Sequence, residues 1–114
     1  MDFKIIDKNK IKILELNTKR IDASNANNFK EALIEASKNS PSIVLDLSKA
    51  DFLDSSALSA LLSVHKILQN KNKNLYIIGL NNKLIKILEI TELTNILNIY
   101  NGIDDIITIK EQNG

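Results

Sequence analysis

The chain has 114 residues, the size of one ordinary domain, and it contains no Cys and a single His, which excludes a Cys- or His-based metal site. Hydrophobic residues make up 44% and charged residues 25%, close to the average of globular domains, which excludes a disordered chain or a membrane span. The net charge of +1 gives no reason to expect nucleic acid or an anionic membrane as a partner. Because the N-terminal residues lack the apolar core of a signal peptide, we expect a cytoplasmic protein.

The first two predicted elements are strands. Short Ile-rich runs occupy residues 2–7 and 10–17, and in the second run apolar residues roughly alternate with charged ones. Asn9 and Lys10 separate the two runs as a tight turn. The pattern therefore predicts a β-hairpin.

From Ser24 onward the hydrophobic period changes to that of a helix. The apolar positions at helical spacing are Ala26, Phe29, Leu33 and Ala36. Asp22 and Ser24 are both candidates for the N-cap of this helix, since their side chains can accept a bond from a free backbone N–H. The Asn-Ser-Pro sequence at residues 39–41 predicts the end of the helix.

An almost wholly apolar run at residues 43–47 predicts a parallel strand covered on both faces, and a second helix follows from Ser55 or Ser56. The predicted buried side of this helix consists of Leu58, Leu61, Leu62, His65 and Leu68. Its predicted polar side consists of Ser59, Ser63, Lys66 and Asn70. Since His65 falls among apolar positions, we expect a partly buried structural His there and not a catalytic one.

The remaining elements continue to alternate. A strand is predicted at Leu75–Leu80, a helix at Asn82–Ile90, a short strand within Ile96–Tyr100, and a helix or turn from Ile103. This order predicts an α/β fold with a mainly parallel sheet of about five strands, an antiparallel N-terminal edge strand and about four helices. We expect one domain that spans residues 1–114.

Residues 46–58 carry most of the candidate functional groups. There a buried strand ends and a helix begins with Asp54, Ser55 and Ser56. In an open α/β sheet, sites gather beyond the carboxyl ends of the strands, so the loop that carries Asp22 is expected beside this segment. One interpretation is that these side chains only cap helices. The other is a switch, in which a Ser at the helix N-terminus accepts a phosphoryl group that brings about −2 charge.

An enzymatic alternative would use Asp22 and Asp54 as paired carboxylates or as a magnesium site. Three Gly in the whole chain leave no Gly-rich phosphate loop, and there is no G-x-S-x-G elbow. The sequence also shows no His placed to support either carboxylate and no Lys in a clear general-base context. We therefore expect no enzymatic activity and no cofactor.

The pattern Asp-Leu-Ser-x3-Phe-x-Asp-Ser-Ser-x-Leu at residues 46–58, between a buried strand and a Leu-rich helix, resembles the STAS domain. The chain is similar to stand-alone anti-sigma factor antagonists, also called anti-anti-sigma factors. This likeness covers essentially the whole chain, including the Ile21–Ala26 entry to the first helix. The resemblance implies that Ser55, which directly follows the motif residue Asp54, is phosphorylated, and that Asp22 is the acidic residue near it.

The resemblance also implies the partners of the protein. The unphosphorylated protein binds an anti-sigma factor that is also its Ser/Thr kinase, which frees a sigma factor for transcription, and a PPM-type phosphatase restores the binding form. The expected partner-binding residues are Asp22, Asp54, Ser56, Ala57, Leu58, Ser59, Ser63 and Lys66. The family usually has Gly at the position of Ala57, so the added methyl group is expected to affect contact with the kinase.

A different role within the same family is also open. The chain could be a constitutive structural subunit of a larger assembly, such as a stress-sensing complex or a lipid-transport ATPase. Ser55 would then be only a helix cap and Ala57 a packing residue. The sequence leaves the oligomeric state open between a monomer and a weak dimer.

Overall fold

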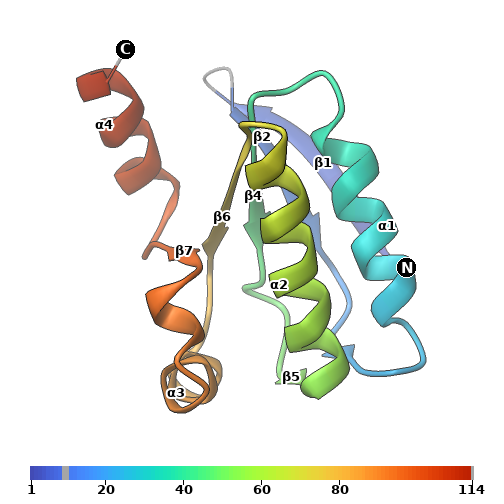
Figure 1. Ribbon diagram of the computed structural model, residues 1–114. Helices are drawn as coiled ribbons and strands as arrows, with labels where there is room; N and C mark the ends of the chain where they lie inside the picture. The colour runs from blue at the N-terminus through green and yellow to red at the C-terminus, as the bar shows by residue number, and fades with distance from the viewer. Residues whose placement is uncertain (9–10, 114) are drawn as a thin grey trace.

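The structure is a computed structural model that describes residues 1–8 and 11–113 (Figure 1). Strand β1 (Phe3–Lys8) pairs antiparallel with β2 (Ile11–Leu16), in a register that sets Phe3 opposite Leu16. This pairing confirms the predicted N-terminal hairpin, while its predicted turn at Asn9 and Lys10 lies outside the described residues.

A five-stranded sheet with the order β1-β2-β4-β6-β7 forms the centre of the molecule. Strands β4 (Ser42–Asp46), β6 (Asn74–Ile78) and β7 (Asn98–Ile99) run parallel to β2, and only β1 is antiparallel. The mixed α/β fold with an antiparallel N-terminal edge strand is therefore confirmed.

Helices α1 (Ala26–Ser37) and α2 (Ser55–Asn70) lie side by side over one face of the sheet (Figure 1). They share the larger hydrophobic core with α3 (Asn82–Ile90) and the short 3-10 helix η1 (Leu93–Asn95). Alternation along the strands sends every second side chain to this core. The predicted bounds of the third helix agree with those of α3.

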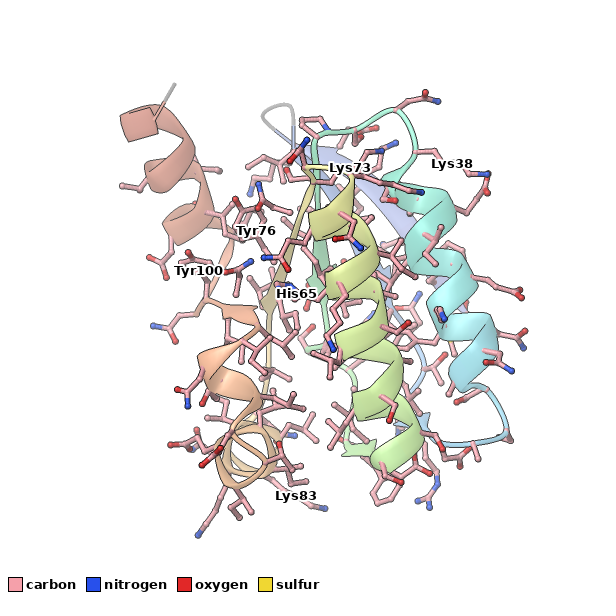
Figure 2. The ribbon with its side chains drawn as sticks, viewed as in Figure 1. Lys38, His65, Lys73, Tyr76, Lys83 and Tyr100 are labelled. Carbon is pink, nitrogen blue, oxygen red and sulfur yellow. The ribbon has the colours of Figure 1, made fainter. Side chains whose placement is uncertain are left out.

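The other face of the sheet carries a second, smaller core. Side chains of β2, β4 and β6 that point away from α1 and α2 pack there against Ile106 of α4 (Ile103–Asn113). Tyr76 of β6 and Tyr100, which precedes α4, are in tilted contact with ring centroids 5.8 Å apart (Figure 2). Isoleucine spacing at the end of the chain predicted a helix or a turn from Ile103, and the structure shows a helix.

The buried side of α2 differs from the prediction. The buried residues are Ala57, Ala60, Leu61, Val64 and Leu68. Leu58 and Leu62 are only half-buried and pack against the flank of the core. The small side chains of Ala57 and Ala60 face inward because α2 lies against α1, and the larger side chains of Leu58 and Leu62 are left at the margin. His65 is half-buried midway along α2 (Figure 2).

A second small sheet was not predicted. Strand β3 (Arg20–Ile21) pairs parallel with β5 (Phe52–Leu53), so the segments before α1 and α2 lie side by side. Strands of two residues carry no hydrophobic periodicity, which explains why the sequence pattern misses them. In the described parts of the chain, no helix is long and apolar enough to cross a bilayer.

Candidate functional site

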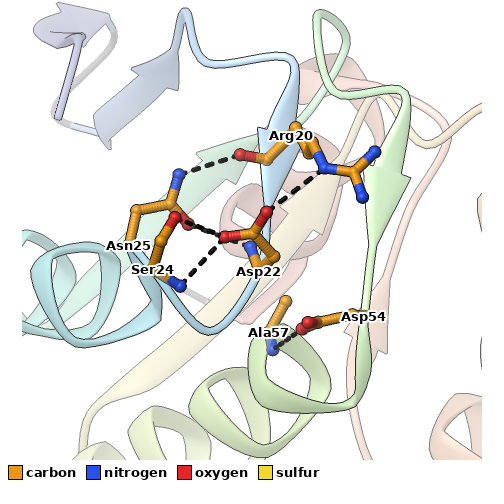
Figure 3. Close-up of polar contacts among 6 residues, drawn as sticks. All are labelled: Arg20, Asp22, Ser24, Asn25, Asp54 and Ala57. Carbon is orange, nitrogen blue, oxygen red and sulfur yellow. Dashed lines mark hydrogen bonds and ion pairs between the residues drawn. The ribbon is translucent and has the colours of Figure 1, made fainter.

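The N-terminus of α2 is built on Asp54. Its backbone is extended, with φ −93° and ψ −174°, and its carboxylate Oδ1 accepts a hydrogen bond of 3.1 Å from the N–H of Ala57 (Figure 3). Asp54 is therefore the N-cap of α2, and the helix begins at Ser55. The sequence had left the cap open between Asp54, Ser55 and Ser56.

The two predicted phospho-site serines have different surroundings. The Ser55 side chain is exposed, and its hydroxyl forms no hydrogen bond with the described residues. Ser56 is half-buried and faces α1. Since Asp54 already caps the helix, the Ser55 hydroxyl is left with no structural bond to make, and it is accessible to another protein.

The β3–β5 pair holds the Asp22 loop against the start of α2. The N–H of Asp54 donates to the carbonyl of Ile21 at 3.2 Å, directly beside Asp22. Figure 3 shows Asp22 and Asp54 on these neighbouring segments. The structure therefore brings together the two segments that carry Asp22 and Asp54, at the end of the sheet where the topology placed them.

Asp22 is held by its own loop. Its Oδ1 accepts bonds from the hydroxyl and, at 2.9 Å, from the N–H of Ser24, while its Oδ2 accepts a bond of 3.2 Å from Nε of Arg20 (Figure 3). The Ser24 donors, with a smaller contribution from Arg20, lower the pKa of the Asp22 carboxyl below its ordinary value of 3.8. Asp22 is thus an anchored anion at the surface of the site.

The prediction that Asp22 or Ser24 caps the first helix is wrong. The N-cap of α1 is Asn25, whose side chain makes no capping bond. It instead accepts a bond of 2.9 Å from the N–H of Asp22 and donates one of 2.9 Å to the carbonyl of Arg20. Asn25 thereby closes the loop in front of α1, and Asp22 is used in a turn with Ser24.

Sequence reasoning also missed Arg20 and Phe52, which β3 and β5 place opposite each other. The Arg20 guanidinium lies over the Phe52 ring, with Cζ 4.0 Å from the ring centroid. Together with its ion pair to Asp22, this contact fixes the cation beside the site. The contact joins residues 32 positions apart in a strand pair without periodicity, so no local signal could have indicated it.

The other predicted partner-binding residues divide into a surface group and one core residue. Ser59 and Lys66 are exposed, and Leu58 and Ser63 are half-buried. Ala57 is fully buried in the larger core. Its methyl group therefore offers no surface to a partner, contrary to the expected effect of Ala in place of Gly. The methyl group points inward because Ala57 lies on the buried side of α2.

Two grooves flank the start of α2. One, of about 500 Å³, lies between α1 and α2, and the α2 residues that line it are Ser56, Ser59, Ala60 and Ser63. The other, of about 240 Å³, lies between α2 and the segment that joins α3 to η1. Its lining residues are Ser55, Leu58, Ser59, Leu62, Thr91 and Leu93. Ser55 thus stands at the rim of an apolar groove, and Thr91 and Leu93 are additions to the predicted surface.

In the described residues, no group of three or more His, Cys, Asp or Glu side chains is arranged to hold a metal ion. Asp22 accepts hydrogen bonds from donors of its own loop, and Asp54 accepts one from the N–H of Ala57 in the first turn of α2. What the site offers is an exposed Ser55 hydroxyl next to the Asp54 cap, with two shallow grooves at the start of α2, an arrangement suited to docking a protein.

A model of the STAS domain family matches residues 3–106, so the chain belongs to the STAS domain family. A Thermotoga maritima protein provisionally assigned as an anti-sigma factor antagonist is 25% identical, with a TM-score of 0.83 over 93% of this chain and 92% of that one. An anti-sigma factor antagonist from Mycobacterium paratuberculosis is 20% identical, with a TM-score of 0.81 over 95% and 92%.

The fold is also that of the Bacillus cell fate determinant SpoIIAA, solved in its phosphorylated form. That protein is 13% identical, with a TM-score of 0.66 over 95% of this chain and 99% of that one. The comparison with curated proteins found no match. Proteins of nearly the same length therefore share this fold from end to end, and the structures of several of them are named as anti-sigma factor antagonists.

Proposed function

We propose that this protein is an anti-sigma factor antagonist controlled by phosphorylation of Ser55. The observation that carries the proposal is the exposed Ser55 hydroxyl at the first position of α2, which Asp54 has relieved of any capping role. In the unphosphorylated form the surface around Ser55 binds an anti-sigma factor that is also its Ser/Thr kinase. This binding releases a sigma factor in the cytoplasm, and a PPM-type phosphatase regenerates the binding form.

The electrostatics of the site support a switch. A phosphoryl group on Ser55 would be stabilised by the positive end of the α2 dipole, so the helix would tolerate the modification. The same group would add about −2 charge beside the carboxylates of Asp22 and Asp54. The surface would then change from mixed charge to strongly anionic while the fold stayed intact, and a partner matched to the first surface would dissociate.

The proposed partner surface runs from Ser55 along the exposed side of α2. It consists of Asp22, Asp54, Ser56, Leu58, Ser59, Ser63 and Lys66, with Thr91 and Leu93 across the smaller groove. The kinase supplies ATP and magnesium for the transfer, so this chain is its substrate and catalyses nothing. The engaged state of both carboxylates supports this passive role.

A capture experiment tests the proposal. Wild type, Ser55→Ala and Ser55→Asp serve as parallel baits in a lysate of the source cell, with bound proteins identified by mass spectrometry. Ser40→Asp is the matched control, because Ser40 lies in the loop between α1 and β4, at the opposite end of the strands, and its only hydrogen bond among the described residues is made by its backbone.

The proposal predicts that a kinase-type ATPase is retained by wild type, Ser55→Ala and Ser40→Asp, and lost by Ser55→Asp. If all four baits retain the same proteins, Ser55 has no switching role and the proposal fails. Retention of the same transporter or stress-complex subunits by all baits would instead assign the chain to a constitutive assembly.

A further inference from the structure

The outer edge of β1 is unpaired. In the described part of the chain, β1 ends the sheet and no strand lies on its outer side. The carbonyl of Asp2 accepts a bond of 2.9 Å from the N–H of Asn17, so residue 2 faces β2. The N–H and C=O groups of successive residues in a strand point to opposite sides. Those of Phe3, Ile5 and Asp7 therefore point outward, away from β2.

Apolar side chains accompany this open edge. Met1, Phe3 and Ile5 are 37%, 37% and 41% exposed, and they account for three of the five exposed large hydrophobic side chains among the described residues. They line a groove of about 770 Å³ against Ala32, Ile34 and Ala36 of α1. An edge strand with exposed apolar side chains is a template for pairing, and natural proteins usually cover one or blunt it with charge.

The sequence of β1 indicates which strand can pair with this open edge. In one register β1 is complementary to a second copy of itself. In a two-fold antiparallel pair, the strand can pair five of its own residues only when the axis passes through Ile5 or Ile6. An axis at Ile6 sets Lys4 opposite Lys8, and like charges directly opposite are destabilising. An axis at Ile5 sets Ile5 opposite Ile5 and Asp2 opposite Lys8 on both sides, with no like charges opposite.

We propose that this edge binds a second copy of the chain, through antiparallel pairing of β1 with β1 about a two-fold axis at Ile5. The outward backbone groups of Phe3, Ile5 and Asp7 meet those of Asp7, Ile5 and Phe3 of the partner, so the hydrogen-bonding phase also matches this register. The two sheets join into one ten-stranded sheet, and the apolar grooves beside α1 meet across the axis. A single strand pair is smaller than a standard interface, so the dimer is reversible and depends on concentration.

The proposal does not depend on the proposed function. None of the proposed partner-binding residues lies on β1, so a second copy leaves the surface around Ser55 open. In the described residues, neither the Asp2 carboxylate nor the Lys8 ammonium has an ion-pair partner within the chain, so substituting them changes the surface and leaves the core intact.

Analytical ultracentrifugation of the full chain over a wide concentration range tests the pairing. Wild type is expected to dimerise as concentration rises. Asp2→Lys places Lys opposite Lys8 twice and abolishes the dimer over that range, whereas the double variant Asp2→Lys with Lys8→Asp restores it. Lys83→Asp on α3 is the matched control and leaves the dimer unchanged. A wild type that is monomeric throughout, or a double variant as monomeric as Asp2→Lys, would overturn the proposal.

A cysteine experiment tests the register, since the natural chain has no Cys. Directly opposite residues in hydrogen-bonded pairs have Cα atoms about 5.5 Å apart, within reach of a disulfide. Under mild oxidation Ile5→Cys should form a covalent dimer. Ile6→Cys should not, because Ile6 lies opposite Lys4 of the partner. Equal cross-linking of the two variants, or none by Ile5→Cys, would contradict an axis at Ile5.

Discussion

Gly79 directly follows β6 and lies close against the turn after β4, which leads to the functional site. Its φ is +81°, a left-handed conformation that residues with a Cβ adopt at a cost. A Cβ built there would lie 2.5 Å from Oδ1 of Asp46 and 2.7 Å from the backbone N of Ser48. These two atoms are themselves joined by a 2.9 Å hydrogen bond that shapes the turn after β4. Gly79→Ala should therefore displace this turn.

Two terms set the size of the effect. The left-handed conformation costs an Ala residue about 1–2 kcal/mol. Opening the Asp46–Ser48 hydrogen bond to relieve the clash costs about 0.5–1.5 kcal/mol more. A total loss of about 1.5–3.5 kcal/mol should lower the Tm of a domain of this size by about 6–15 °C.

Thermal unfolding followed by circular dichroism measures this loss. Gly102→Ala is the matched control, because a Cβ at Gly102 meets no atom within 4 Å and its φ is not in the left-handed region. We expect the control to change stability by less than about 1 kcal/mol, the range of an uncrowded Gly-to-Ala change. If the Tm of Gly79→Ala matched that of Gly102→Ala, the close approach between Gly79 and the Asp46–Ser48 turn would not constrain the fold.

Three further predictions concern the site and the core beneath it. Asp54→Ala should lose the cap of α2 and about 0.5–2 kcal/mol in urea unfolding, whereas Asp54→Asn keeps an acceptor and should lose less; equal losses would show that the 3.1 Å bond to Ala57 has no weight. Because the pKa of Asp22 is lowered, its ionised form stabilises the fold above the ordinary pKa of 3.8, and this contribution disappears as pH falls through the lower folded-state pKa. Asp22→Asn should therefore weaken the acid dependence of unfolding, and an unchanged pH profile would refute the assignment. Leu61→Ala empties a fully buried position and should cost about 2–5 kcal/mol. Leu62 is half-buried at the smaller groove, so Leu62→Ala should cost clearly less in the same denaturation assay, and equal costs would contradict the observed orientation of α2.

The elements that the sequence predicts well have strong local signals. The predicted bounds of α3 agree with the structure because Asn81 caps it, accepting a bond of 2.8 Å from the N–H of Leu84, and the apolar spacing begins directly after the cap. The end of α1 is similarly local, since Asn39 follows it with φ +64°. Continuous apolar runs likewise indicated β4 and β6, because parallel strands buried on both faces are apolar throughout.

The features that the sequence did not predict depend on contacts between distant segments. The β3–β5 pair arises from two short loops that the larger sheet brings together, so nothing within either loop marks it as a strand. The orientation of α2 is set by packing against α1, which selects Ala57 and Ala60 for the interior over the larger Leu58. For Asn25, the sequence shows a residue suited to capping, but only the position of Arg20 reveals that it closes the loop instead.

The candidate site was predictable in its location more than in its detail. Topology alone placed Asp22 and Asp54 at the same end of the sheet, and the structure brings their segments together. The sequence offers Asp54, Ser55 and Ser56 as possible N-caps of α2. The structure shows that Asp54 is the cap, which leaves the Ser55 hydroxyl exposed and without a capping bond. The groove that adds Thr91 and Leu93 depends on the positions of α3 and η1, and these two residues lie more than 30 residues after Ser55 in the chain.

The most direct test of the central claim is site-resolved mass spectrometry of the pure protein after incubation with the captured ATPase and Mg-ATP. We predict one phosphate on Ser55, no phosphate at that site in Ser55→Ala, and loss of the complex once the phosphate is in place. No phosphate on Ser55, or a phosphorylated protein that binds the ATPase as tightly as the unmodified one, would contradict a switch at the start of α2.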